Sequence, residues 1–128
     1  MLRQGPIPVF LHGVIEYLAG AFLIAAPFLF SYQASAATAV SIVAGVTVLV
    51  IAAATEGPTS AIDSIPISVH LVLDFALAAL LVATPFLFGF SDEGAPTAVF
   101  IVLGVAHLLV TIATRFRPEK DAGQAKAG

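Results

Sequence analysis

The sequence has no cysteine, and only 10% of its 128 residues are charged. Without cysteine there is no disulfide framework, no thiolate metal site and no thiol nucleophile. Because a soluble domain averages about 25% charged residues, this chain has too little polar surface to cover a core in water. Its net charge of −3 also disfavours nucleic-acid binding. These shortages disfavour a soluble enzyme, a disordered chain and a nucleic-acid-binding protein.

Apolar residues dominate instead, at 59% of the chain, with a mean hydropathy of +1.05. Four apolar stretches, residues 8–30, 38–55, 66–88 and 97–114, approach the length of about 20 residues that a membrane-spanning helix needs. They are rich in Ala, Leu and Val and lack a period of two, which argues against a β-barrel. The sequence therefore predicts an all-α, polytopic four-helix bundle in a membrane.

The basic residues lie near the two ends of the chain: Arg3, Arg115, Arg117, Lys120 and Lys126. The loops at residues 31–37 and 89–96, between the spans, contain no Lys or Arg. Since Lys and Arg concentrate on the cytoplasmic side of a membrane protein, we expect both termini to be cytoplasmic. We therefore predict a multi-pass protein of the plasma membrane.

The chain contains an internal repeat, because residues 7–32 align without a gap on residues 65–90. The matches include Ile7-Pro8 with Ile65-Pro66, His12 with His70, Glu16 with Asp74, and Pro27-Phe28-Leu29-Phe30 with Pro85-Phe86-Leu87-Phe88. After one extra residue in the second loop, Thr38-Ala39-Val40 meets Thr97-Ala98-Val99. The sequence therefore contains two tandem copies of a two-helix hairpin, and both copies enter the membrane from the same side. Their pseudo-twofold axis should lie along the membrane normal.

The repeat divides the chain into four parts. We expect a first transmembrane hairpin at residues 1–56, a cytoplasmic connector at 57–65, a second hairpin at 66–116 and a polar cytoplasmic tail at 117–128. The first apolar run resembles a signal peptide. Because an internal segment has the same pattern, we expect the first span to be retained.

Each repeat carries a proline followed by an aromatic residue, Pro27-Phe28 in the first and Pro85-Phe86 in the second. A proline cannot donate a backbone hydrogen bond, so we expect each helix to be kinked or to end there. The aromatic residues that follow should lie near the outer interface as half an aromatic belt; they are Phe28, Phe30, Tyr32 and Phe90.

The segments Ala26-Pro27-Phe28 and Thr84-Pro85-Phe86, the second followed by Leu87-Phe88-Gly89-Phe90-Ser91-Asp92, resemble the signature of the SPW-repeat integral membrane proteins. Members of that family have Ser-Pro-Trp near the end of the first of two transmembrane helices. Here phenylalanine stands where the family has tryptophan. The resemblance implies a membrane protein of two hairpin repeats, and it supplies no catalytic residue.

Five ionisable residues lie inside the predicted spans: His12, Glu16, His70, Asp74 and His107. Such residues are costly in a membrane, at about 2.5–3.5 kcal/mol for Asp on insertion scales. The His and the acidic residue of each repeat lie one helical turn apart and so share a face. The rise per residue places Glu16, Asp74 and His107 at one depth, about 12 Å from the cytoplasmic boundary. We therefore expect an intramembrane polar cluster that faces the interior of the bundle.

Three interpretations of this cluster remain open. Its members satisfy one another and hold the hairpins in register, or the carboxylates carry protons with the histidines as a relay, or the side chains bind a metal or a haem. Three histidines and two carboxylates suit Zn, Fe or Mn. However, His-x3-Glu is not an established ligand spacing, and His-Glu-x2-His is missing. We therefore predict no metal site and no cofactor.

The sequence also lacks Gly-x-Ser-x-Gly and a Gly-rich phosphate loop. We expect a structural or accessory membrane component, not an enzyme. The lipid bilayer is its first partner, and a homo-oligomer or a larger membrane complex is the second. Small-residue faces suited to helix contacts are Ser41-x3-Gly45, Ala21-x3-Ala25 and Ala79-x3-Ala83. The alternative is a proton- or cation-linked transporter that uses the polar cluster.

Overall fold

The computed structural model describes residues 6–115, and four long helices account for most of them. They are α1 (Val9–Leu29), α2 (Ser35–Ala54), α3 (Ile67–Leu87) and α4 (Gly94–Ala113). Each is long and apolar enough to cross a membrane. The prediction of an all-α, four-helix membrane bundle is confirmed.

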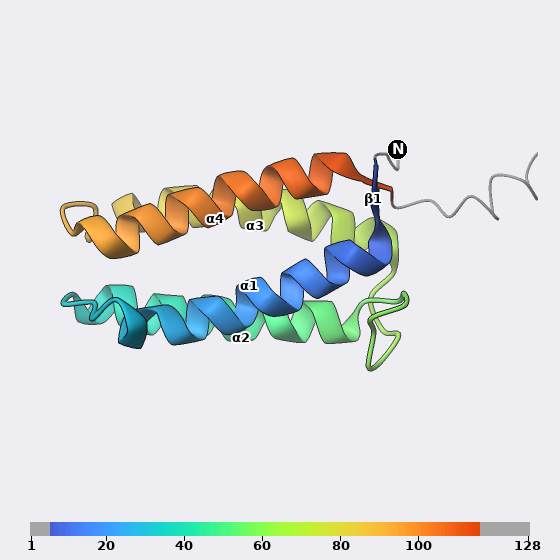
Figure 1. Ribbon diagram of the computed structural model, residues 1–128, viewed down its shortest axis with the longest axis horizontal. Coiled ribbons are helices and arrows are strands. Elements are labelled where there is room, and N and C mark those ends of the chain that lie inside the picture. Colours follow the sequence, from blue (N-terminus) through green and yellow to red (C-terminus); the bar gives the residue numbers. More distant parts are fainter. Residues whose placement is uncertain (1–5, 116–128) are drawn as a thin grey trace, which may run out of the picture.

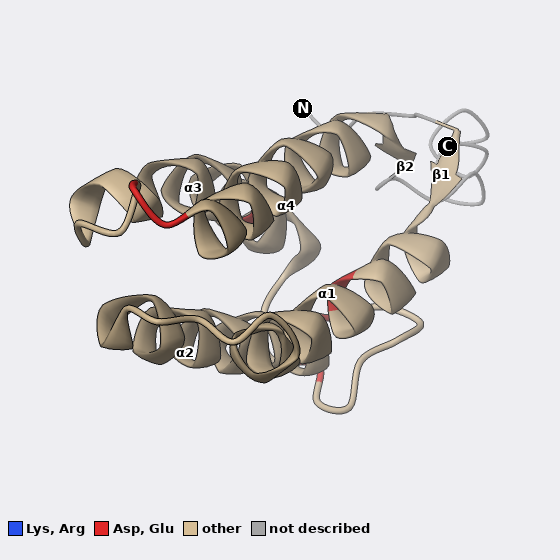
Figure 2. Cartoon of the chain, turned by 60° about the vertical axis from the view of Figure 1, so that its left-hand side comes forward, with Lys and Arg blue, Asp and Glu red and all other residues tan. Residues whose placement is uncertain are grey.

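The helices form two hairpins, with α1 packed on α2 and α3 packed on α4 (Figure 1). The loops within the hairpins lie at one end of the bundle, and the connector between the hairpins lies at the other (Figure 1). Seen from a second direction, α1 inclines away from α2 toward the connector end, where it approaches α4 (Figure 2). The two copies are therefore related by a pseudo-twofold axis that runs along the bundle.

Short backbone pairings join the two hairpins at the connector end. Strand β1 (Ile7–Pro8) pairs in parallel with β2 (Thr114–Arg115). The equivalent positions of the other pair, Thr55 and Ile65, form a parallel bridge. The segment that enters each hairpin thus lies beside the segment that leaves the other hairpin. This crossed pairing repeats the twofold symmetry of the sequence in the backbone.

Helices α2 and α4 begin earlier than hydropathy predicts, at Ser35 and Gly94. Hydropathy marks the start of the apolar stretch, whereas the first helical turn reaches into the polar boundary of the membrane. The N-terminus of α2 has no cap from its own side chains. Instead, the Glu93 carboxylate accepts hydrogen bonds from the backbone N–H groups of Gln33 and Ala34, at 2.7 and 2.9 Å. Glu93 thereby links the hairpins at the loop end.

The prolines do not end their helices, because α1 continues through Pro27 to Leu29 and α3 continues in the same way through Pro85. Pro27 has no N–H to donate to the carbonyl of Leu23, one turn earlier. That carbonyl instead accepts a hydrogen bond of 2.5 Å from the Ser41 hydroxyl of α2. A neighbouring helix therefore satisfies the group that the proline leaves open. Both prolines are buried, whereas Phe28 and Phe86 are exposed.

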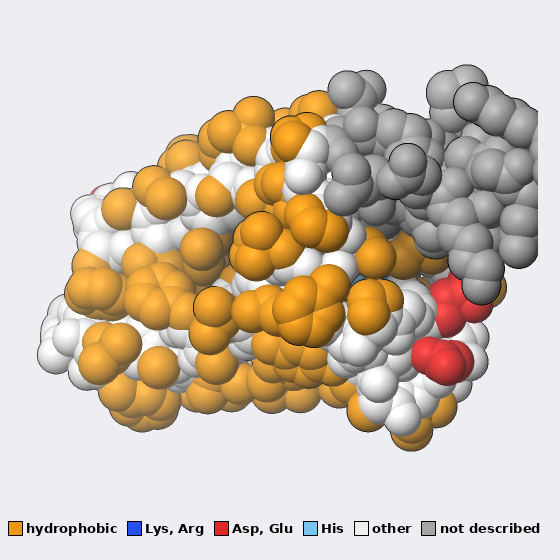
Figure 3. Space-filling view, turned by 45° about the vertical axis from the view of Figure 1, so that its right-hand side comes forward, with side chains coloured by type: hydrophobic (Ala, Val, Ile, Leu, Met, Phe, Trp, Pro, Cys, Tyr) orange, Lys and Arg blue, Asp and Glu red, His pale blue; other side chains and the backbone are white. Residues whose placement is uncertain are grey.

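The predicted aromatic belt is wrong for two of its four members. Tyr32 and Phe90 are buried in the apolar core, where the Phe90 ring packs edge-on against Phe100 with centroids 5.6 Å apart. The chain turns inward after each helix, so these rings close the loop end of the bundle. Phe28 and Phe30 are exposed, as a belt requires. Hydrophobic side chains are spread widely over the part of the face that is not grey in Figure 3, which suits contact with lipid.

Candidate functional site

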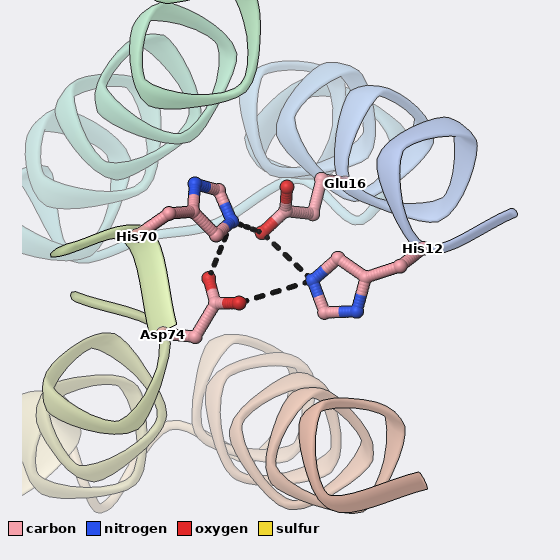
Figure 4. Close-up of side chains that lie close together, drawn as sticks. All are labelled: His12, Glu16, His70 and Asp74. Carbon is pink, nitrogen blue, oxygen red and sulfur yellow. Dashed lines mark hydrogen bonds and ion pairs between the residues drawn. The ribbon is translucent and has the colours of Figure 1, made fainter. Parts of the chain in front are cut away.

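Helices α1 and α3 bring together four ionisable side chains, which we call the quartet: His12, Glu16, His70 and Asp74 (Figure 4). Each helix supplies one histidine and one carboxylate a turn apart, so both point from the same helical face. All four are nearly inaccessible, with 1% to 4% of their surface exposed. The inward orientation keeps these costly groups away from hydrocarbon.

The contacts within the quartet alternate between nitrogen and oxygen. Within each helix, His12 Nε2 lies 3.2 Å from Glu16 Oε2, and His70 Nε2 lies 3.0 Å from Asp74 Oδ1. Between the helices, His12 Nε2 lies 3.0 Å from Asp74 Oδ2, and His70 Nε2 lies 2.9 Å from Glu16 Oε2. Each imidazole therefore faces both carboxylates. The histidine–carboxylate contacts between α1 and α3 are as short as those within each helix, so the quartet links the two hairpins.

Two threonines hold the other nitrogen of each quartet histidine. Nδ1 of His12 lies 2.7 Å from the Thr114 hydroxyl, and Nδ1 of His70 lies 2.6 Å from the Thr55 hydroxyl. Each threonine donates its own proton to the carbonyl one turn earlier in its helix, at 2.5 and 2.6 Å respectively. The hydroxyl oxygens are therefore left to accept, and Nδ1 of each histidine must carry the hydrogen. In both repeats, Nε2 is the nitrogen that faces the carboxylates.

His107 joins the quartet from α4. Its Nε2 lies 3.3 Å from Asp74 Oδ1. The equivalent position in the first repeat is Val48, a buried apolar residue on α2. Asp74 thus contacts three imidazoles, whereas Glu16 contacts two. The twofold symmetry of the site is therefore broken here, as well as where Glu16 of one repeat corresponds to Asp74 of the other.

All five predicted cluster residues therefore meet, at the connector end of the bundle. The proline and phenylalanine motif lies near the other end of α1 and α3 and takes no part in the cluster. Sequence reasoning missed Thr55 as a partner of His70. A signal was present, because the repeat aligns Thr55 with Thr114, and Thr114 continues the polar face of His107. The expected domain boundaries stay a prediction, and the tail at residues 117–128 lies outside the described residues.

A small cavity of about 20 Å³ adjoins the quartet on the connector side. That volume is about enough for one water molecule. His12, Glu16 and His70 line its inner wall, and the connector lines its outer wall through residues such as Pro58 and Thr59. The connector therefore separates the quartet from the surface at this end of the bundle.

A haem does not fit between His12 and His70. Their ring centroids are 6.0 Å apart, and both Nε2 atoms contact the same two carboxylates. Those carboxylates fill the space that a flat macrocycle would need between axial ligands. The arrangement is suited to mutual hydrogen bonding or to holding a single small ion.

The family profile of the SPW repeat domain matches residues 10–114, a stretch that includes both hairpins and the whole cluster. No curated protein and no solved structure matches the chain. The matched stretch begins inside α1 and ends at the threonine that contacts His12.

Proposed function

This chain belongs to the SPW repeat family, and from that premise we propose that it is a structural or accessory component of the plasma membrane and not an enzyme. One observation carries the proposal: the ionisable side chains of the described spans contact one another, and none faces lipid. They connect α1, α3 and α4 and so join the two hairpins. Ionisable side chains that bind one another across the two hairpins stabilise the fold of the protein itself.

The part of the core nearer the hairpin loops supports the same role. Its buried side chains are mostly apolar, among them Leu23, Ala26, Leu81 and Phe100. Two buried hydroxyls there donate to backbone carbonyls, Ser41 to Leu23 and Thr84 to Leu80. The buried hydroxyl of Tyr32 lies at the same end. A proton path across the membrane needs groups that pass protons on. Near the loop end, the Ser41 and Thr84 hydroxyls are both occupied by the backbone.

The connector end is proposed to face the cytoplasm. Strands β1 and β2 lie at that end, so the chain enters and leaves the bundle on one side (Figure 1). The basic residues that favour a cytoplasmic side are Arg3, Arg115, Arg117, Lys120 and Lys126. Apart from the backbone of Arg115, they lie outside the described residues.

Self-association is proposed to use the alanine faces of α1 and α3. The Ser41-x3-Gly45 face is already occupied within the protein, because Gly45 packs against Gly20 of α1. In contrast, Ala21 and Ala79 are exposed at equivalent positions of the two repeats. Small residues allow close approach of helices in a membrane, where packing drives association.

We expect Ala21→Leu with Ala79→Leu to reduce the oligomeric fraction about tenfold, because the larger side chains keep the backbones apart. Native mass spectrometry of the full chain in detergent measures that fraction. Ala39→Leu is the matched control, since Ala39 is exposed on α2, away from these faces. If the double variant keeps the wild-type oligomer, the alanine faces are not the contact.

The transport alternative is tested in proteoliposomes that contain a pH-sensitive dye. We expect the proton flux of the wild-type chain to equal that of protein-free vesicles, and Glu16→Gln to leave it unchanged. Asp92→Asn serves as control because Asp92 is an exposed acidic residue in a loop. A pH-dependent flux that Glu16→Gln abolishes and Asp92→Asn preserves would replace the structural role with transport.

A further inference from the structure

We infer that the quartet is a binding site for one divalent transition-metal ion, with His12 Nε2, His70 Nε2 and the carboxylates of Glu16 and Asp74 as ligands. One potential ligand atom from each residue lies within 4.8 Å of the others. Histidine and carboxylate are the ligand types that zinc, iron(II) and manganese(II) share. The inference goes beyond the proposed function, because it concerns what the cluster binds.

The contact distances describe a ring around a common centre. Four of its sides are 3.2, 2.9, 3.0 and 3.0 Å, and each of these joins an imidazole nitrogen to a carboxylate oxygen. Asp74 takes part through both oxygens, Oδ1 toward His70 and Oδ2 toward His12. A flat ring of these five atoms has its centre about 2.4 Å from each of them, a few tenths of an ångström longer than the usual bond from zinc to nitrogen or oxygen. The four side chains converge on a point that an ion can occupy with little rearrangement (Figure 4).

Thr55 and Thr114 provide a second and independent reason. Both hydroxyls donate to backbone carbonyls and so fix the hydrogen on Nδ1 of the facing histidine. Metal-binding histidines almost always donate their other ring N–H to such a partner, which sets the tautomer and the orientation of the ring. Ion pairing alone does not require both imidazoles to present the same nitrogen to one centre. Ligation requires an unprotonated ring nitrogen directed at the ion, and a neutral imidazole with its hydrogen on Nδ1 presents Nε2 in this way in both repeats.

Charge selects a divalent ion. The ring holds two carboxylates and two imidazoles, so a divalent cation with neutral imidazoles gives a site with no net charge. Neutrality matters because an unbalanced charge is costly inside a membrane. His107 contacts the Asp74 carboxylate at 3.3 Å and is placed to orient that ligand through a hydrogen bond.

The cavity beside the quartet gives such an ion room. It has a volume of about 20 Å³ and is lined by three of the four ligands, so it has space for about one water molecule next to the ion. Glu56, an exposed carboxylate, lines the same cavity from the connector side. A negative group beside the cavity and open to solvent attracts cations from solution.

Spacing along one helix could not reveal this site. His-x3-Glu and His-x3-Asp each supply two ligands, which matches no established metal motif. The full set of four exists only after α1 and α3 pack face to face. For that reason the structure leads to a different conclusion about metal from the one that the sequence favours.

The test measures metal binding by the full chain, purified without a polyhistidine tag and stripped with a chelator. Equilibrium dialysis against Zn²⁺ or Mn²⁺, read by elemental analysis, should give one ion per wild-type chain. His70→Ala and Glu16→Ala should lower the affinity by more than about 100-fold, whereas Thr55→Val should keep one ion and lower the affinity by about 10- to 100-fold. Asp92→Asn, an exposed acidic residue outside the quartet, should bind as the wild type does.

A spectroscopic measurement on the wild-type chain makes the test independent of how variants fold. Electron paramagnetic resonance of bound Cu²⁺ should show hyperfine coupling to two imidazole nitrogens. Absence of that coupling, no ion in the wild-type chain, or equal binding by His70→Ala overturns the inference. A chain that binds no metal, yet remains oligomeric and impermeable to protons, overturns this inference alone and leaves the proposed function intact.

Discussion

Asp74→Val is expected to be the most damaging single substitution in the cluster, with a loss of about 3 kcal/mol from the free energy of unfolding. Asp74 contacts His12, His70 and His107, at 3.0 to 3.3 Å. Valine removes the acceptor that these three imidazoles share and leaves them buried without it. Unfolding of the metal-free chain in a denaturing detergent, followed by circular dichroism, measures the loss.

The same variant should loosen the contact between the hairpins. Because the chain has no cysteine, spin labels can be placed at Val43→Cys and Val102→Cys, which are exposed and equivalent in the two repeats. The distance between the labels should be narrowly distributed in the parent protein and broad after Asp74→Val. Glu16→Leu is the comparison, with a smaller effect, since Glu16 contacts two imidazoles. Equal effects of the two substitutions would contradict the central position of Asp74.

The cluster shows how far a duplicated sequence predicts a site. Residues at equivalent positions of a repeat lie at the same depth, so sequence alone predicted that Glu16 and Asp74 share one level, with His12 and His70 one turn away on the same helical faces. It could not show that each histidine contacts the carboxylate of the other repeat as closely as its own. That result depends on the angle and distance at which α1 and α3 meet, which no local pattern encodes.

The ends of the helices show the opposite limit. Hydropathy located four spans because lipid imposes a minimum apolar length on any crossing helix. It misplaced the start of α2, just before which the Glu93 carboxylate of the other hairpin accepts hydrogen bonds from Gln33 and Ala34. It also assigned Tyr32 and Phe90 to the membrane surface, although both rings are buried. Composition predicts where a helix can lie, but tertiary contacts decide where it ends.

Gly45→Val is expected to separate α1 from α2 and to destabilise the first hairpin by about 3 kcal/mol or more, at the upper end for overpacking. A Cβ atom at Gly45 would lie 2.6 Å from the Gly20 carbonyl oxygen and 2.7 Å from Ile24 Cγ1. The Gly20 carbonyl is backbone, so it cannot move without displacing α1. This close approach is the kind that small residues permit between membrane helices. Thermal unfolding in detergent, followed by circular dichroism, checks the loss.

The second repeat supplies a matched comparison, because Gly104 is the equivalent of Gly45. A Cβ atom at Gly104 would meet first the Val82 side chain, at 2.7 Å, and then the Ala78 carbonyl oxygen, at 3.0 Å. A side chain can change rotamer where a backbone cannot, so Gly104→Val should cost less than Gly45→Val. Gly94→Ala, with no atom within 4 Å of the added carbon, should have little effect. If Gly104→Val proves the more damaging of the two valine variants, contact with backbone is not what limits the approach of α1 to α2.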